Sequence, residues 1–475
     1  MRESRRTNLI ILSALLMIAA VFAAYATLVM RWFATPARTE NPATRKASAN
    51  LAEARKEFRT RLLDCRAHLR LSEALWKAGR PTDSFYVLYA ARQLFSKETF
   101  RAAHAEIVLG AGGPAAGVRT RLKGLNDPAL SVPIHAQTAR EDPASPEGRN
   151  SLEQLSLMAM GDENRSGGDA ARLARAALEE LYREDPRQPE KLAALAGAAF
   201  GRGDVALAYA LASEALNKHS DHAGASRIMG MIALKDRDLD AAVRWLTAAW
   251  EHNPDDLYSA AKLAQIYDKR RADPEAALLF HLALYRQNPD YDDNGPIERR
   301  IHEILDSRRE NLLKDAPIES LADRMKLDDA SLRAEACLRA AAFKDQRWID
   351  ALGELLDDDT EIVRRNADYA LFQIARQKPD AVRARRDQWL GGPQPLVRIR
   401  ALNLFADLDG KNAFPLAAAA LRDPVPAVRA YAAVMVLEHY FMAIPEAVKL
   451  RARYLAEERD PDALAFVHRF SKLAQ

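Results

Sequence analysis

The feature that most constrains the fold is the similarity of the chain to itself at a spacing of 34 residues, from about residue 189 to residue 290. Small residues recur in register. One series is Ala208, Ala242 and Ala276, and a second is Ala215, Ala249 and Ala283. A period of this length accommodates two helices and a turn, and small residues let the helices pack closely. We therefore expect an all-α helical-repeat solenoid in which each helix pair packs on its neighbours.

The turns and ends of these units resemble those of the tetratricopeptide repeat (TPR). The turns are Gly203-Asp204 and Arg237-Asp238, and the proline ends are Pro254 and Pro289. The resemblance covers three units and implies two antiparallel helices in each. It departs from the family at Ser220, where proline is expected, and in the absence of an early tryptophan. Upstream, residues 169–186 match a degenerate second helix of the same kind.

From about Asp328 the spacing changes to 31 residues and a different signature appears, whose four copies are separated by 31, 34 and 31 residues. An aliphatic residue, an arginine and an alanine share one frame in Leu332-Arg333 with Ala336, Val363-Arg364 with Ala367, Val397-Arg398 with Ala401, and Val428-Arg429 with Ala432. This pattern resembles the short HEAT repeat of the phycobilisome-lyase type, with a cap over residues 460–473. The arginines are expected to form a ladder with neighbouring carboxylates, and the alternative is a row of projecting cations.

The N-terminus contains an uncharged run over residues 9–30, with basic residues on both sides. At 1.5 Å per residue, a helix of this length spans about 33 Å, enough to cross a hydrocarbon core about 30 Å thick. We expect a single-pass transmembrane helix in a bacterial inner (cytoplasmic) membrane, with the N-terminus inside and the repeats in the periplasm or otherwise outside the cytoplasm. The alternative is a signal peptide cleaved near Ala24-Tyr25-Ala26, which would release a secreted protein.

These patterns divide the chain into successive segments. They are a basic cytoplasmic head (1–8), a transmembrane helix (9–30), a basic stalk (31–50), degenerate TPR-like helices (51–110), a Gly/Pro-rich linker (111–150), TPR-like repeats (151–290), connecting helices (291–327) and HEAT-like repeats with a C-terminal cap (328–475). An unbroken helix over residues 297–312 would join the two repeat arrays rigidly, and a break there would make a hinge.

The chain offers little sign of catalytic or metal chemistry. Its net charge of +3 lacks the basic excess typical of nucleic-acid binding, and Cys65 and Cys337 lie too far apart to suggest a disulfide framework. Residues 290–295 match the start of a calcium loop, but Ile301 replaces the glutamate that such a loop needs, and a turn explains them equally well. No phosphate-binding, zinc-protease, hydrolase or dinucleotide motif occurs. We expect no enzyme activity, no metal site and no cofactor.

The TPR resemblance also implies a binding groove, lined by the first helix of each unit. Carried over to this chain, its positions are Arg227, Met231, Leu234, Lys235, Tyr258, Gln265 and Lys269. The basic members would favour an acidic, partly apolar peptide segment of a partner protein. The groove does not resemble the TPRs that clamp a C-terminal carboxylate, because Ala193 and Gly197 replace the required Lys and Asn.

A solenoid of this kind exposes a long surface suited to extended segments or helices of other proteins. We therefore expect a membrane-anchored, non-catalytic scaffold or adaptor that binds protein partners. One alternative is an assembly or maturation factor for an enzyme or envelope complex, as the resemblance to chromophore-lyase repeats implies. Another is that the groove residues only solvate a spacer. The pattern assigns neither a partner nor an oligomeric state.

Overall fold

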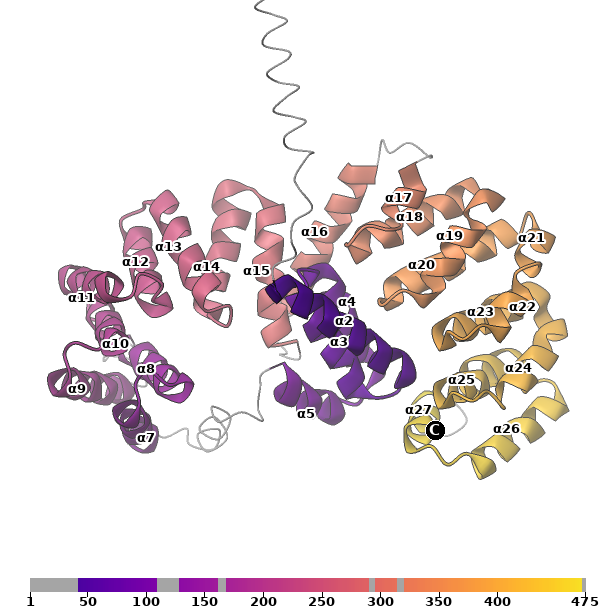
Figure 1. Ribbon diagram of the computed structural model, residues 1–475, viewed down its shortest axis with the longest axis horizontal. Helices are drawn as coiled ribbons and strands as arrows, with labels where there is room; N and C mark the ends of the chain where they lie inside the picture. The colour runs from indigo at the N-terminus through magenta and orange to yellow at the C-terminus, as the bar shows by residue number, and fades with distance from the viewer. Residues whose placement is uncertain (1–41, 109–127, 161–167, 290–294, 314–319, 472–475) are drawn as a thin grey trace, which may run out of the picture. The chain divides into compact units, whose positions relative to one another are not determined.

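The computed structural model describes residues 42–108, 128–160, 168–289, 295–313 and 320–471, and every regular element within these ranges is a helix (Figure 1). The chain divides into two compact units, residues 1–52 and 53–475. Of the first unit, residues 42–52 are described, and they form the beginning of helix α2 (Pro42–Thr60).

The predicted head, transmembrane helix and most of the predicted stalk lie outside the described residues. Within the described residues, none of the helices combines the length and the apolar character needed to cross a membrane.

The second unit contains three groups of helices, which Figure 1 follows by colour. The N-terminal helices are α3 (Cys65–Lys77), α4 (Pro81–Leu94) and α5 (Lys97–Ile107). The middle stack comprises α7 (Pro128–Glu141), α8 (Pro146–Ala159), α9 (Gly168–Glu184), α10 (Pro189–Gly201), α11 (Val205–Lys218), α12 (Ala223–Lys235), α13 (Leu239–His252), α14 (Leu257–Ile266), η1 (Tyr267–Arg271), α15 (Pro274–Gln287) and α16 (Gly295–Leu313). The C-terminal stack follows α17 (Leu321–Arg324) and comprises α18 (Ala330–Phe343), η4 (Gln346–Trp348), α19 (Ile349–Glu354), η5 (Leu355–Asp357), α20 (Glu361–Ala375), α21 (Pro379–Arg383), α22 (Arg386–Gly391), α23 (Pro395–Asp409), η6 (Gly410–Ala413), α24 (Phe414–Ala420), α25 (Pro426–Tyr431), η7 (Ala432–Glu438), α26 (Pro445–Glu457) and α27 (Pro461–Phe470).

The middle stack confirms the helix pairs that the 34-residue period predicts. Each turn contains one residue in the left-handed region, Gly203 (φ +84°), Arg237 (φ +63°) or Ala272 (φ +51°). An aspartate follows each of them and caps the next helix, with its carboxylate accepting a backbone N–H at 2.9–3.0 Å. The cap satisfies one of the free N–H groups of the helix end, so the turn and the helix start are specified together.

The first alanine series, Ala208, Ala242 and Ala276, does not keep its register in the structure at its last member. The last turn of the α14 segment is the π-helix η1, which holds one more residue than an α-helical turn would. Asp273 consequently caps α15 at 35 residues after Asp238, the cap of α13. Ala277 is fully buried where Ala276 was expected, and Ala276 remains partly exposed. The same insertion accounts for Pro289 standing one residue late.

The expected linker over residues 111–150 holds two helices in its described part, separated by a short non-helical segment over residues 142–145. Helix α7 occupies residues 128–141, and α8 begins at Pro146. The prolines that suggested a loop stand partly at helix starts, where the missing N–H of proline costs nothing. Residues 109–127 lie outside the described residues.

In the C-terminal stack the repeated arginines form the expected ladder. Arg333, Arg398 and Arg429 each bind, through two nitrogens, a carboxylate of the following repeat (Asp358, Asp423 and Glu458) at 2.7–3.0 Å. Each also donates from Nη1 to the carbonyl oxygen six residues earlier, at 2.8–2.9 Å. One guanidinium therefore fixes the loop before its own helix and the start of the next repeat.

Arg364 departs from this pattern because no carboxylate stands at the matching place in the next repeat. It keeps the bond to the carbonyl six residues earlier, that of Asp358, but pairs with Glu361 of its own helix at 3.0 Å. Its guanidinium also lies 5.9 Å from the ring of Phe58 on α2.

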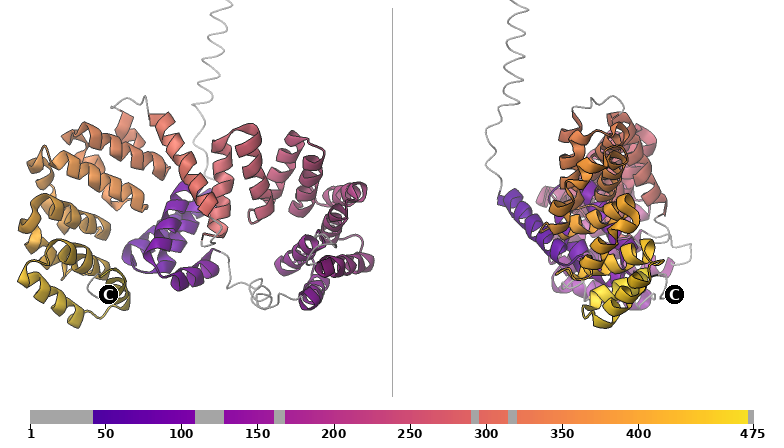
Figure 2. Two further views of the ribbon diagram at one scale, coloured as in Figure 1. Left: turned by 180° about the vertical axis from the view of Figure 1, so that it is seen from behind. Right: turned by 90° about the vertical axis from the view of Figure 1, so that its right-hand side faces the viewer.

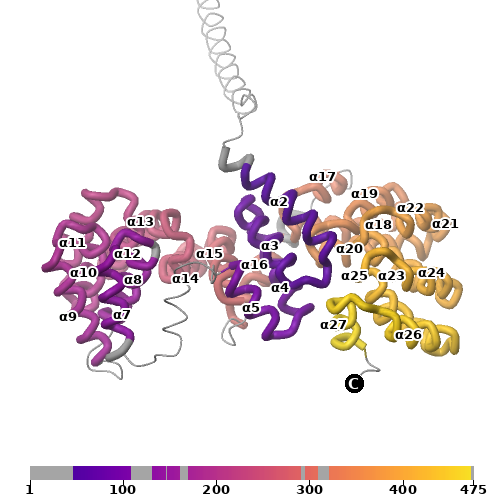
Figure 3. The backbone as a smooth tube through the Cα atoms, turned by 60° about the horizontal axis from the view of Figure 1, so that its bottom comes forward, coloured from indigo at the N-terminus to yellow at the C-terminus, as the bar shows by residue number. Residues whose placement is uncertain are grey.

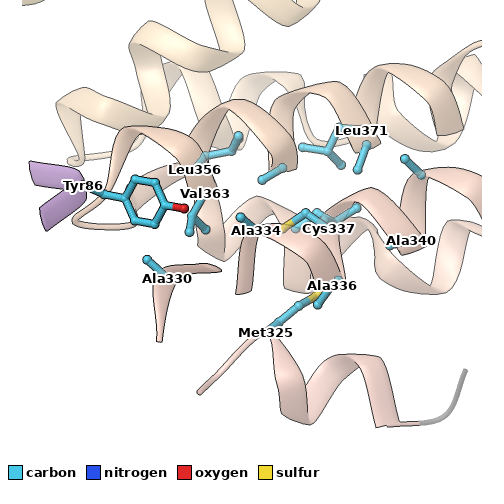
Figure 4. Close-up of a cluster of buried hydrophobic side chains, with 14 of the residues drawn as sticks. Tyr86, Met325, Ala330, Ala334, Ala336, Cys337, Ala340, Leu356, Val363 and Leu371 are labelled. Atoms are coloured by element: carbon cyan, nitrogen blue, oxygen red, sulfur yellow. The ribbon is translucent and has the colours of Figure 1, made fainter. Parts of the chain in front are cut away.

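The N-terminal helices α3, α4 and α5 lie in the segment expected to hold degenerate TPR-like helices, 51–110, and they pack between the two stacks. Helix α4 contacts α15 on one side and α18 and α20 on the other, as Figure 2 shows from behind. Figure 4 shows part of the shared core, where Tyr86 lies near Ala330 and Val363. Glu73 binds Arg286 through both carboxylate oxygens at 2.9 Å, over 213 residues of sequence. The two stacks therefore share one hydrophobic core with these helices.

Helix α16 runs unbroken over residues 295–313, as the rigid alternative requires. Two further contacts tie the far end of the C-terminal stack to the N-terminal helices. Leu63 packs in the cluster formed by α25, η7, α26 and α27, and Arg469 on α27 donates to the carbonyl of Gln93 at 3.1 Å. Figure 3 lets the reader follow the chain between these points. The last repeats are thus anchored to the first helices of the chain.

Replacing Asp83, at the start of α4, by alanine should destabilise the protein strongly. Asp83 is fully buried, accepts the backbone N–H of Ala330 at 2.6 Å and pairs with Arg333 at 3.1 Å. Breaking a buried pair leaves an uncompensated charge, so we expect a loss of about 3 kcal/mol in the free energy of unfolding, measured by urea denaturation.

The matched control is Asp350→Ala. Asp350 also pairs with an arginine, Arg385 at 2.7 Å, but its side chain is 73% exposed. An exposed pair of this kind contributes less than about 1 kcal/mol. Equal losses for the two variants would contradict a special role for the buried contact.

Candidate functional site

The predicted groove residues lie on α12, α14 and η1. Lys235, Gln265 and Lys269 are exposed, Leu234 and Tyr258 are half-buried, and Arg227 and Met231 are buried. Neighbouring groove positions on α10 are closed by packing. A Cβ at Gly197 would come within 2.1 Å of the Ser156 hydroxyl on α8.

Arg227 is engaged inside the stack. Its guanidinium pairs with Glu153 of α8 at 2.5 Å and with Asp256, the cap of α14, at 3.3 Å. The side chain is 6% exposed. Arg227 therefore ties α8, α12 and α14 together, and it contributes no free cation to the edge of the groove.

Lys235 and Lys269 lie at the ends of equivalent helices, one repeat apart. Lys235 lies 5.9 Å from the ring of Phe200, at the matching end of α10. Within the described residues neither lysine has a carboxylate partner. Asp268, next to Lys269, binds Arg300 at 3.0 Å and His281 at 2.7 Å, and exposed Asp236 follows Lys235. Both lysine ammonium groups therefore stand outside the ion pairs of the described chain.

A charged depression of about 280 Å³ lies where α2 meets the C-terminal stack. Arg55 binds Asp359 at 2.6 Å, Arg59 binds Asp357 at 2.9 Å, and Arg333 binds Asp358. Most of the charged groups that line the depression are thus paired with one another, and exposed Lys326 adds one further cation. The contacts fasten α2 to the loop before α20.

A second polar cluster was not found from the sequence. It crosses α20, α23 and the helical residues after η7. Asn403 on α23 donates to Asp368 on α20 at 3.4 Å, and Tyr440 donates to Asp407 on α23 at 2.7 Å. Arg400 on α23 binds Glu361, at the start of α20. A possible signal was the recurrence of polar residues about one repeat apart, at 368, 403 and 440, inside otherwise apolar helices.

The two acidic groups of α20 differ sharply in ionisation. Burial raises the pKa of Asp368 to about 7, and the negative charges of Asp407 and Glu361 add to that effect. Burial alone would also raise the pKa of Glu361, but Arg400 and Arg364 lower it to about 2. Oppositely shifted carboxyl groups of this kind occur at functional sites, although structural networks produce them too.

The described residues contain no group of three or more potential metal ligands. His222, one of two neighbouring histidines in the sequence, caps α12 by accepting the N–H of Ala225 at 3.2 Å. Of the segment that resembled a calcium loop, 290–295, residues 290–294 lie outside the described residues. Cys65 and Cys337 are buried free thiols, and burial raises the pKa of both.

No protein-family model matches the sequence, and no curated protein sequence is significantly similar to it. One similar solved structure is described as "Human IFIT1 dimer with m7Gppp-AAAA". It is 13% identical over 86% of this chain and 95% of that chain, with a TM-score of 0.27. A likeness this low carries no argument about the fold or the function. The helices themselves establish that the described chain is an all-α helical-repeat protein.

Replacing Asp368 by asparagine should stabilise the protein at pH 8 and leave it unchanged at pH 4. The folded-state pKa of about 7 lies above the ordinary aspartate value of 3.8, so stability falls as pH rises from about 4 to 7 and stays low above that range. Asparagine can still accept the hydrogen bond from Asn403 and carries no charge. At pH 8 we expect a gain on the order of 3 kcal/mol, since one pKa unit corresponds to about 1.4 kcal/mol.

Urea denaturation across this pH range would measure the effect. Asp380→Asn serves as the control, because that side chain is 97% exposed. A gain for Asp368→Asn that did not depend on pH would contradict the assignment.

Proposed function

We propose that this protein is a membrane-anchored, non-catalytic scaffold whose middle stack binds an acidic, partly apolar segment of a partner protein. The observation that carries the proposal is the pair of exposed lysines, Lys235 and Lys269, at equivalent helix ends without carboxylate partners in the described chain. Half-buried Leu234 and Tyr258 supply apolar contact beside them.

The architecture favours the middle stack over the C-terminal stack for this role. We assign the C-terminal repeats to the HEAT type on their arginine ladder, whose guanidinium groups are used within the stack. Part of that stack is already covered by helices of the same chain, since Phe58 lies against Arg364 and Leu63 against the last repeats. Lys235 and Lys269 form what we call the lysine edge of the middle stack. No segment of the described chain covers this edge in the same way.

Reversing both lysine charges should weaken binding of an acidic peptide. We expect Lys235→Glu with Lys269→Glu to reduce the affinity of the full-length chain for a short fluorescein-labelled peptide of alternating glutamate and leucine by about tenfold. Each exposed pair contributes up to about 1 kcal/mol, and tenfold corresponds to about 1.4 kcal/mol. Fluorescence anisotropy at low salt would measure the change.

The matched control is Lys218→Glu with Lys344→Glu. Lys344 is half-buried at the end of α18, and Lys218 binds Glu214 and the carbonyl of Arg187. The control therefore changes the net charge equally but leaves the lysine edge intact. If both pairs of variants weakened binding alike, the attraction would come from net charge alone and the groove assignment would be wrong.

The proposed location is a single-pass inner-membrane protein with its N-terminus in the cytoplasm and its repeats outside. Cys65 and Cys337 are 4% and 0% exposed, so native thiols should contribute little background labelling. We expect Asp221→Cys, at an exposed turn, to react with a membrane-impermeant maleimide in intact spheroplasts. Labelling only after lysis would place the repeats in the cytoplasm, and recovery in the soluble fraction would favour a cleaved signal.

A further inference from the structure

A continuous polar surface crosses three successive helices of the C-terminal stack. Asp368 and Asp407 lie on α20 and α23, and Asn403 donates to both carboxylates, at 3.4 and 3.5 Å. Tyr440, just beyond η7, donates to Asp407 and to Asn403. These contacts place the exposed sides of the three helices on one face, which we call the acidic face.

The acidic face has negative charge without a matching cation. Asp407 is exposed, and its hydrogen-bond partners in the described chain are a tyrosine and an asparagine, neither of which carries positive charge. The nearest cation of the network, Arg400, is bound to Glu361 and lies 3.9 Å from Asp368. Burial is the main cause of the raised pKa of Asp368. Arg400 lowers that pKa, and the negative charges of Asp407 and Glu361 raise it further.

Two large side chains with apolar surface are exposed on helices that carry this network. Tyr369, next to Asp368 on α20, is 50% exposed, and Met435 in the π-helix η7 is 40% exposed. Tyr431, Met435 and His439 recur every four residues along one side of this helix. Tyr431 is buried close to Arg400 and therefore lies at the polar network. A tyrosine face attracts a cation, and a methionine adapts to varied apolar surfaces.

We propose that the acidic face binds a basic segment of a partner protein, in which a lysine or arginine pairs with Asp407 and neighbouring apolar residues cover Tyr369 and Met435. The argument from complementarity is that a partner cation supplies the charge that the network lacks. An arginine fits best, because its planar guanidinium can bind a carboxylate and lie on an aromatic ring at once. This surface is separate from the lysine edge of the middle stack and requires a partner segment of opposite charge.

The test uses two probes on the purified full-length chain. They are short fluorescein-labelled peptides of alternating arginine and leucine, and of alternating glutamate and leucine, followed by fluorescence anisotropy. We expect the arginine probe to bind saturably and more weakly at high salt, since exposed charges are screened. Asp407→Asn should weaken it by about tenfold, and Tyr369→Ser by a few-fold.

Three controls make the outcome decisive. Asp221→Asn, an exposed carboxylate on the middle stack, should leave binding of the arginine probe unchanged. Asp407→Asn should not alter binding of the glutamate probe, so failure of this inference and failure of the lysine-edge proposal can be told apart. Thermal unfolding of each variant establishes that Asp407→Asn and Tyr369→Ser retain the fold.

Three results would overturn the inference. One is equal binding of the arginine probe by the wild type and Asp407→Asn. Another is the absence of saturable binding by the folded wild type. The third is a monomer–dimer equilibrium in sedimentation that Asp407→Asn abolishes, because the occupant of the acidic face would then be a second copy of this chain.

Discussion

The rest of the second unit depends on the buried carboxylate of Asp83. Removing a carboxylate from water costs several kcal/mol, and burial accordingly raises the pKa of Asp83. The N-terminus of α18 and the guanidinium groups of Arg333 and Arg80 offset part of that cost. Arg333 in turn holds Asp358 of the next repeat. The first rung of the arginine ladder therefore includes a residue from the N-terminal helices. The C-terminal stack begins on a contact that spans about half of the chain.

This contact distinguishes the chain from a simple solenoid. In a simple solenoid each repeat touches its neighbours, and stability is close to a sum of local contributions. Here α4 packs between the middle and C-terminal stacks, and the last repeats return to the N-terminal helices through Leu63 and Arg469. Such contacts couple the stability of distant repeats. Their closure costs more chain entropy than neighbour contacts do.

The sequence could predict the repeats because their causes are local. A capping aspartate after a left-handed residue specifies each turn of the middle stack, and the 34-residue period follows from it. Two features could not be predicted in this way. The π-helix η1 shifts the register so that Ala277 replaces Ala276 in the core, and no local pattern marks the insertion. The position of α4 between the stacks results from packing between residues more than 200 apart, which a periodic pattern does not encode.

The candidate binding surfaces are the charged side chains that remain after those that form ion pairs within the stacks are set aside. Arg227 was expected at the groove, but it pairs with Glu153 of α8, 74 residues away in the sequence, and a repeat pattern does not encode that contact. The ladder arginines use most of their donors within their own stack. Lys235, Lys269 and Asp407 differ because their charges have no opposite partner in the described chain. The net charge of +3 does not reveal these surfaces, because a basic edge and an acidic face contribute opposite charges to the sum. Under the two proposals, the middle stack holds an acidic partner segment and the C-terminal stack holds a basic one.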